Sequence, residues 1–190
     1  MDVGALVENA GTCTAICEAV TLGKPLTARL LTVTGSLINR PLNLRAPIGT
    51  PFNDLVEFCG GLRGTPGKII CGGPMMGLAQ YTLDTATTKT TSGLLLLERS
   101  QVRQFTSTPC ISCGRCVAAC PMGLMPCELS EWAENEDYDG AESSHVLDCI
   151  ECGSCAYECP AHRPLVQHLR RAKAEVTARR RARAAAQSGA

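Results

Sequence analysis

Two cysteine strings of identical spacing are the residues of this chain with the clearest chemistry. Residues 110–121 and 149–160 both read C-x2-C-x2-C-x3-C-P, with isoleucine after the first cysteine and glycine after the second. Thiolates are soft ligands that suit iron–sulfur clusters and zinc. Three thiolates at this spacing can hold three corners of one iron–sulfur cube, and Gly114 and Gly153 permit the tight turn that this requires.

The fourth cysteine of each string follows a three-residue step that begins a helix and carries it away from the first three. This is the pattern of bacterial ferredoxins with two clusters, in which the fourth cysteine ligates the neighbouring cluster. We therefore expect one 4Fe-4S cluster on Cys110, Cys113, Cys116 and Cys159. A second 4Fe-4S cluster is expected on Cys149, Cys152, Cys155 and Cys120. Because the strings exchange a ligand, loss of either cluster should unfold both.

Zinc and disulfide bonds are the two alternatives for these cysteines. Structural zinc usually takes two cysteine pairs separated by a longer spacer, which the third and fourth cysteines of each string do not fit. Residues 1–4 show neither a basic nor an apolar leader, so we do not expect export. Disulfides are rare in a reducing cytosol, and 13 cysteines in that compartment favour metal binding.

The remaining cysteines and the histidines carry weaker signals. Cys127 lies outside both strings, and a free buried thiol is favoured there over a ligand. Four cysteines on apolar faces are expected to be small core residues: Cys13, Cys17, Cys59 and Cys71. Three histidines are expected to be solvated: His145, His162 and His168.

The overall composition limits the partners of the chain. Its 18 basic and 18 acidic residues give zero net charge, and only 4% of the residues are aromatic. Nucleic-acid binding calls for a net basic face and commonly for aromatic stacking, so we expect no nucleic-acid partner. The longest apolar run, residues 94–97, is far shorter than the roughly 18 residues of a membrane-spanning helix.

The first hundred residues predict a mixed α and β domain. We expect a helix at residues 12–22, ended by Gly23, and a second helix opened by Thr50 as N-cap and Pro51 in its first turn. The second helix is expected to bury Leu55, Val56, Phe58 and Cys59 and to end at Gly60 and Gly61. Strands are expected at residues 29–35, with 36–38 as a hairpin or bent partner, and at 68–71 and 93–98. This outline is that of a small β-grasp-like unit, followed by a linker at residues 100–109.

The remainder of the chain predicts a helical domain with strongly patterned charge. Residues 128–158 hold ten acidic side chains and no Lys or Arg, whereas residues 170–183 hold seven basic side chains and one acid, Glu175. The acidic segment should lower the potential of nearby clusters, because negative charge disfavours an added electron. The last helix should begin near Pro164 and fray at its Arg-rich end, which could contact anionic lipid, an acidic partner or the chain's own acidic segment.

Several motifs in a fixed order give the chain a resemblance to a known family. They are residues 31–35 (LTVTG), 46–51 (APIGTP) and 72–77 (GGPMMG), then the two cysteine strings, then 164–167 (PLVQ) and 171–175 (RAKAE). In this order they resemble the C subunits of Rnf electron transport complexes, over nearly the whole chain. Paired cysteine strings occur in many proteins, whereas the glycine-rich turn ahead of them is much more specific.

The resemblance implies an α+β chain whose small β-grasp (soluble-ligand-binding β-grasp) domain precedes a helical, ferredoxin-like domain with two 4Fe-4S clusters. It divides the chain into residues 1–24, a remnant helix of an absent flavin domain; 25–100, the β-grasp domain; 101–176, the double-cluster domain; and 177–190, a basic flexible tail. FMN and NADH are expected only in the absent N-terminal domain. The chain alone is therefore expected to relay electrons rather than to transfer hydride.

The same resemblance implies a function and a location. The chain is expected to be a peripheral electron-transfer subunit of an ion-translocating ferredoxin:NAD oxidoreductase, on the cytoplasmic side of the bacterial cytoplasmic membrane. Its expected partners are other subunits of that complex and a ferredoxin or flavin domain. Three alternatives are a cobalamin reductase of bacterial microcompartments, a non-redox ligand-binding module braced by metal, and a free ferredoxin-like carrier.

Overall fold

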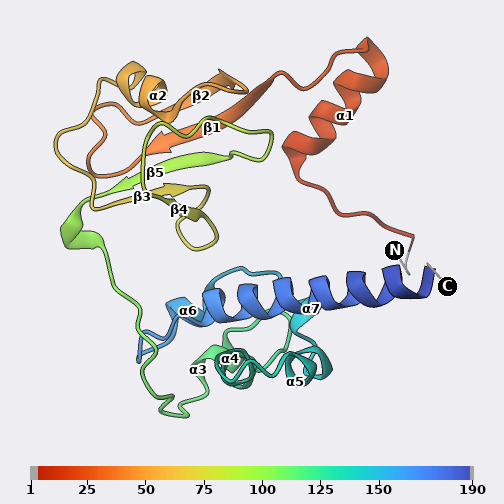
Figure 1. The fold of residues 1–190 in the computed structure, drawn as a ribbon. Coiled ribbons are helices and arrows are strands. Elements are labelled where there is room, and N and C mark those ends of the chain that lie inside the picture. The colour runs from red at the N-terminus through yellow and green to blue at the C-terminus, as the bar shows by residue number, and fades with distance from the viewer. Residues whose placement is uncertain (1–3, 189–190) are drawn as a thin grey trace. The chain divides into compact units, whose positions relative to one another are not determined.

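The computed structural model describes residues 4–188 and separates into two compact units, divided between Val102 and Arg103 (Figure 1). The N-terminal unit holds a five-stranded sheet and the C-terminal unit is helical, which confirms the α+β class. Residues 1–3 of the expected remnant segment and 189–190 of the expected tail lie outside the described residues. Over residues 4–188, no helix has both the length and the apolar character needed to cross a membrane.

The sheet of the N-terminal unit is mixed, with its first and last strands side by side at the centre. Its strands are β1 (Ala28–Thr34), β2 (Leu42–Pro47), β3 (Lys68–Cys71), β4 (Leu78–Gln80) and β5 (Gly93–Leu97). The spatial order is β2-β1-β5-β3-β4, in which β1 and β5 are parallel and the other neighbours antiparallel. Alternation places Leu31 and Val33 in the core and leaves Leu30 exposed.

Helix α2 (Phe52–Phe58) packs its apolar face into the same core as the sheet. Phe52, Leu55 and Val56 are buried there with residues of β1 and β5, whereas Phe58 is 69% exposed. The expectation that Phe58 is buried is therefore wrong, because Phe58 lies on the solvent side of the face that Phe52, Leu55 and Val56 bury. Thr50 does not cap the helix; Pro51 holds the N-cap position, and the Thr50 hydroxyl donates to the Pro47 carbonyl at 2.8 Å.

The partner of β1 also differs from the sequence prediction. Residues 36–38 form a turn rather than a strand, with a single bridge from Ile38 to Leu62, and β1 pairs instead with β2. Gly35 explains the turn: its φ is 131°, and an added Cβ would lie 2.0 Å from the Leu96 carbonyl oxygen. Only glycine permits that close passage of the chain over β5.

Helix α1 (Ala10–Leu22) has the predicted end but not the predicted environment. Asn9 caps its first turn, and Gly23 ends it in the left-handed conformation. The helix buries no residue, and both Cys13 and Cys17 are exposed. The prediction of core positions for these two cysteines is wrong. For the other two, Cys59 is buried as predicted and Cys71 is partly buried.

The C-terminal unit is organised around one long helix. Its helices are α3 (Arg115–Ala118), α4 (Pro126–Glu134), α5 (Tyr138–Ser143), α6 (Ser154–Tyr157) and α7 (Leu165–Ser188), and single 3-10 turns lie at Arg99–Gln101, in the N-terminal unit, and at Val146–Asp148. Figure 1 shows α7 running along α4 and α5. Leu169, Ala172 and Val176 of α7 are buried against Leu129 and Ala133 of α4, so this stripe holds the unit together.

The basic end of α7 does not fray where the sequence predicts. The helix continues to Ser188 through an Ala- and Arg-rich segment, and these residue types have high helix propensity. Arg179 and Arg183 pair with Asp139, and Arg180 pairs with Glu142. Of the three contacts expected for this end, the structure therefore has the one to the chain's own acidic segment.

Candidate iron–sulfur centre

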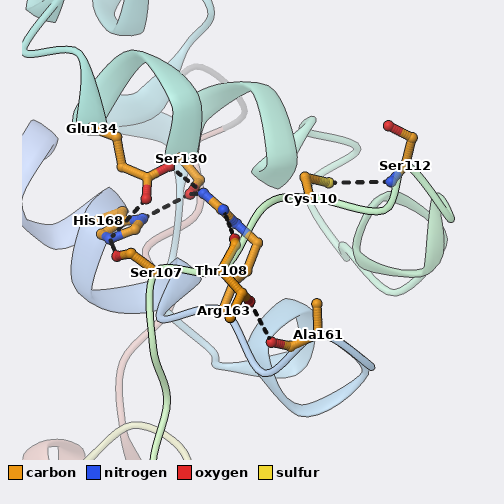
Figure 2. A network of polar contacts seen from close by, with 9 residues as sticks. All are labelled: Ser107, Thr108, Cys110, Ser112, Ser130, Glu134, Ala161, Arg163 and His168. Carbon is orange, nitrogen blue, oxygen red and sulfur yellow. Dashed lines mark hydrogen bonds and ion pairs between the residues drawn. The ribbon is translucent and has the colours of Figure 1, made fainter.

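Both cysteine strings fold into the same local structure. Gly114 and Gly153 adopt left-handed φ values of 71° and 85° and stand at the N-caps of α3 and α6. Two residues earlier, Ser112 and Glu151 also have positive φ, at 53° and 56°. Each string thereby turns back on itself and aims a backbone N–H at its own first cysteine. The Ser112 N–H lies 3.4 Å from Cys110 Sγ (Figure 2), and its counterpart in the second string has the same distance.

The first site is a cavity of about 740 Å³ whose walls include Cys127 and four cysteines of the two strings. These are Cys110, Cys113, Cys116 and Cys159, three from the first string and one from the second. Cys110 and Cys113 are exposed, Cys116 is buried and Cys159 is partly buried. The remaining wall combines apolar residues with five polar ones, among which the charged side chains are Arg163 and Glu128, Glu131 and Glu134 of α4.

The second site is a much tighter cavity of about 20 Å³. Its cysteines are Cys149, Cys152, Cys155 and Cys120, again three from one string and one from the other. Its remaining wall includes Leu124 and Pro126 from the first half, Val166 and Leu169 from α7, and one charged residue, Glu151. The two sites thus have the same donor set of four thiols but different surroundings.

The thiol sets fit a cluster by the chemistry of their donors. Four cysteine sulfurs are the donor set of a cubane cluster, and each cavity gathers four cysteines of the two strings, with Cys127 as a fifth at the first. Within residues 4–188, no three His, Cys, Asp or Glu side chains come together as a site for a single metal ion. The cysteines of the two strings instead line the two cavities.

Burial controls the protonation of the thiols. Burial, with Cys127 close by, raises the pKa of Cys116 to about 11, and burial, with Cys149 close by, raises the pKa of Cys155 to about 12. Burial also raises the pKa of Cys149, whereas a hydrogen bond with Ser154 lowers the pKa of Cys152. Since thiolate is the binding form, loading of the deepest cysteines must release protons.

A buried polar network adjoins the first site (Figure 2). Arg163 is 6% exposed; it pairs with Glu134, donates through Nη2 to Ser130 Oγ at 3.0 Å, and donates through Nη1 to the Thr108 carbonyl. A hydrogen bond of 2.7 Å joins Ser130 Oγ to His168 Nδ1. The network ties the segment leading into the first string to α4 and α7.

The histidines separate into two kinds. His145 and His162 are exposed, as predicted. His168 is not solvated: its side chain is 16% exposed, and burial lowers its pKa. The prediction failed because the apolar stripe of α7 brings the histidine against α4, where Ser130 and Glu134 replace water as its polar neighbours.

Two residues that line the first cavity were not predicted to do so from the sequence. Cys127 is partly buried rather than fully buried; it packs beside Cys116 and lines the first cavity. Arg163 belongs to no motif recognised in the sequence, but an alignment of the two repeats would have pointed to it. It stands four residues after Cys159, as Leu124 stands four residues after Cys120.

The comparisons with known proteins place two domain families on this chain. Residues 30–79 match the SLBB domain family, and residues 103–177 match the 4Fe-4S dicluster domain family. The chain therefore matches the SLBB domain family in its first half and the 4Fe-4S dicluster domain family in its second. The two matches fall on either side of the boundary between its two compact units.

Curated relatives extend the match over nearly the whole chain. It is 50% identical over 92% of its length to the C subunit of the proton-translocating ferredoxin:NAD(+) oxidoreductase complex of Clostridium ljungdahlii. It is 45% identical over 95% to the C subunit of the Na(+)-translocating complex of Acetobacterium woodii, and 44% identical over 94% to that of the ion-translocating oxidoreductase complex of Rhodobacter capsulatus. The chain spans 38%, 41% and 34% of these relatives. The resemblance to the C subunits of Rnf complexes is confirmed.

Proposed function

We propose that this chain is the electron-transfer portion of an ion-translocating ferredoxin:NAD oxidoreductase complex. The observation that carries the proposal is the composition of the two cavities, each walled by three cysteines of one string and the fourth of the other. The match to a dicluster domain and the names of the relatives support the same interpretation. Bound 4Fe-4S clusters supply one-electron transfer.

The ligands are proposed to be exchanged between the strings. Cys110, Cys113, Cys116 and Cys159 hold the first cluster. Cys149, Cys152, Cys155 and Cys120 hold the second. Exposed Cys110 and Cys113 bring the first site to the surface of the unit, where an electron partner can approach. The apolar wall of the second site excludes water from its thiols.

The N-terminal unit is proposed to be a β-grasp domain that docks other subunits or a flavin domain. The sheet order, with parallel β1 and β5 at the centre and α2 packed into its core, supports this assignment. We assign no FMN or NADH site to this chain and propose that hydride transfer belongs to other parts of the complex. The chain is proposed to act peripherally, at the cytoplasmic face of the membrane.

The test is the metal content and the magnetic signature of the chain. Anaerobically purified protein is analysed for iron and acid-labile sulfide, then reduced with dithionite for EPR. About eight irons per chain and spin-coupled reduced signals are expected from two neighbouring cubane clusters. Zinc, or a folded chain without metal, would overturn the proposal. Iron with efficient reduction of a corrinoid would favour the cobalamin reductase alternative.

A further inference from the structure

Arg163 is the one charged side chain that is buried among the described residues. Its Nη1 and Nη2 atoms are held by Thr108, Ser130 and Glu134. Its Nε atom is buried and has no hydrogen-bond partner within residues 4–188. A buried donor without an acceptor costs free energy, so this N–H calls for a group that the protein itself does not supply there.

The place of Arg163 identifies that group. Arg163 lines the first cavity together with the four cysteines of the first site. The internal repeat gives the same position to Leu124, which lines the second cavity. The preceding residues, Gly123 and His162, have similar positive φ values of 65° and 50°, so the backbone presents both positions alike. A guanidinium therefore stands at the first site where the second site has an apolar side chain.

Resting on the two-cluster function proposed above, we propose that Arg163 tunes the first cluster. Its free Nε–H donates a hydrogen bond to a sulfur of that cluster or of its ligands, and its charge favours the added electron. Hydrogen bonds to sulfur and net charge are two of the factors that set cluster potentials. The consequence is an unequal pair at the counterpart positions: Arg163 raises the potential of the first cluster, and the second site has Leu124 there, its nearby cation being Lys173 at the Cys149 carbonyl.

Glu134, Ser130 and Thr108 act as positioning residues for the guanidinium. They engage Nη1 and Nη2, leave Nε without a partner, and hold Arg163 in the wall of the first cavity. Glu134 also opposes the guanidinium charge, because it lines the same cavity. The network therefore predicts opposite effects for removal of the two charges. Loss of Arg163 leaves Glu134 uncompensated, and loss of the Glu134 charge leaves Arg163 uncompensated.

The experiment is an EPR-monitored redox titration of the full, cluster-loaded chain. The variants are Arg163→Leu, which copies the counterpart Leu124, Arg163→Lys and Glu134→Gln. Arg181→Leu is the matched control, because it removes the same charge from an exposed position on α7. Cys113→Ser, at a ligand of the first site, identifies which of the two potentials belongs to the first cluster.

Opposite shifts of one potential are the expected result. Arg163→Leu should lower the potential of the first cluster, Glu134→Gln should raise it, and Arg163→Lys should fall between Arg163→Leu and the unaltered chain. The second potential and the Arg181→Leu control should move much less. If Arg163→Leu cannot retain its first cluster, the direction of the potential shift in Glu134→Gln alone decides whether the proposal holds.

If the variants keep their full iron content and the two potentials stay unchanged, or shift equally at both clusters, the role proposed for Arg163 is wrong. A failure of the two-cluster function is distinguishable, because the unaltered chain would then lack the iron and sulfide of two clusters. A purely structural role for Arg163 would lower stability and cluster occupancy without opposite shifts in the two charge variants.

Discussion

The two cysteine sites of the C-terminal unit share one backbone turn and differ in their walls. Around the first site, α4 contributes the carboxylates of Glu128, Glu131 and Glu134. Around the second, α7 contributes Val166 and Leu169. The string sets where the thiols stand, whereas the helix that follows the string sets what surrounds them. A repeated motif can therefore provide two chemically different environments within one small domain.

The difference extends to access. The first cavity has a volume of about 740 Å³ and two exposed cysteines, whereas the second has about 20 Å³ and its cysteines are buried or partly buried. A small partner, an oxidant or a chelator reaches the first site more easily. The enclosed second site is correspondingly better protected from water. The first site is therefore the one that we propose exchanges electrons with external partners.

The largest expected effect tests whether the two sites really exchange ligands. In the crossed arrangement, Cys120 and Cys149 serve the same cluster, and Cys110 serves the other. The double variant Cys120→Ala/Cys149→Ala removes two ligands of the second cluster and should therefore retain at most about four of eight irons, fewer where loss of one cluster also unfolds the other. Cys110→Ala/Cys120→Ala removes one ligand from each cluster and should retain close to none. Iron and sulfide analysis of anaerobically purified protein measures both.

Ligation within each string gives the reverse pattern. Cys110→Ala/Cys120→Ala would then keep about half of the iron, and Cys120→Ala/Cys149→Ala would lose nearly all of it. Replacement of Cys13 and Cys17, which are exposed on α1, is the matched control for the loss of two thiols and should leave the iron content unchanged. The same double variants thus distinguish two arrangements that single substitutions would not separate.

The apolar wall of the second site gives the next largest effect. Leu169 is 1% exposed, packs in the core between α4 and α7, and lines the second cavity. Leu169→Ala should lower the free energy of unfolding by about 2–5 kcal/mol, the usual cost of a large-to-small change in a core. Guanidinium unfolding of the loaded chain under anaerobic conditions measures it.

Ile111 provides the control for that change at the first site. Its side chain is 63% exposed, so Ile111→Ala should change the free energy of unfolding by no more than about 0.5 kcal/mol. Equal effects of Leu169→Ala and Ile111→Ala would contradict the difference between an enclosed and an open site. If Leu169→Ala loses the second cluster at a lower guanidinium concentration than the unaltered chain does, the difference between the enclosed and the open site is supported further.

The sequence predicts the local turn of each cysteine string well because that turn is set by neighbouring residues. The spacing of thiols, the glycines at Gly114 and Gly153, and the step to the fourth cysteine all act within about a dozen residues. The same is true of the end of α1 at Gly23 and of strand β3, which needed no information from elsewhere in the chain. The crossed ligand set itself follows from the ferredoxin pattern and stays a prediction.

The walls of the sites and the pairing of strands could not be predicted because they depend on distant contacts. Strand β2 alternates Leu42, Leu44 and Ala46, but only its pairing with β1 reveals the strand. Arg163 resembles an ordinary surface residue until the fold packs it against α4. The stripe of α7 predicted buried positions correctly, whereas the ion pairs that accompany its basic end join residues about forty positions apart.

The buried His168 predicts a pH effect beside the first site. Burial lowers its pKa below the ordinary value of 6.5; Glu134 opposes this shift, and Arg163 and Arg171 add to it. Because the unfolded chain then binds more protons, the stability that neutral His168 provides is present above about pH 6.5 and is lost as the pH falls toward the lower, folded pKa. Thermal unfolding across this window measures the loss.

The variant His168→Gln removes the titrating group and retains a side chain able to bond Ser130. Its unfolding temperature should depend less on pH between about 5 and 7 than that of the unaltered chain. His145→Gln is the control, because His145 is exposed and lies outside the network. An equal pH dependence for all three proteins would show that His168 does not titrate in this range.

The smallest expected effect concerns the basic end of α7, which lies beyond the residues that wall the two cavities. Arg180 pairs with Glu142 across exposed surface, so Arg180→Ala should cost about 0.2–1 kcal/mol. Faster amide hydrogen exchange over residues 177–188 is the sensitive measurement, and the difference from the unaltered chain should shrink in about 1 M salt because such pairs are screened. Arg181→Ala is the control, since Arg181 has no ion pair within the described part of the chain. Equal exchange in the two variants would mean that helix propensity alone maintains this end, and that the acidic segment of α5 does not hold it.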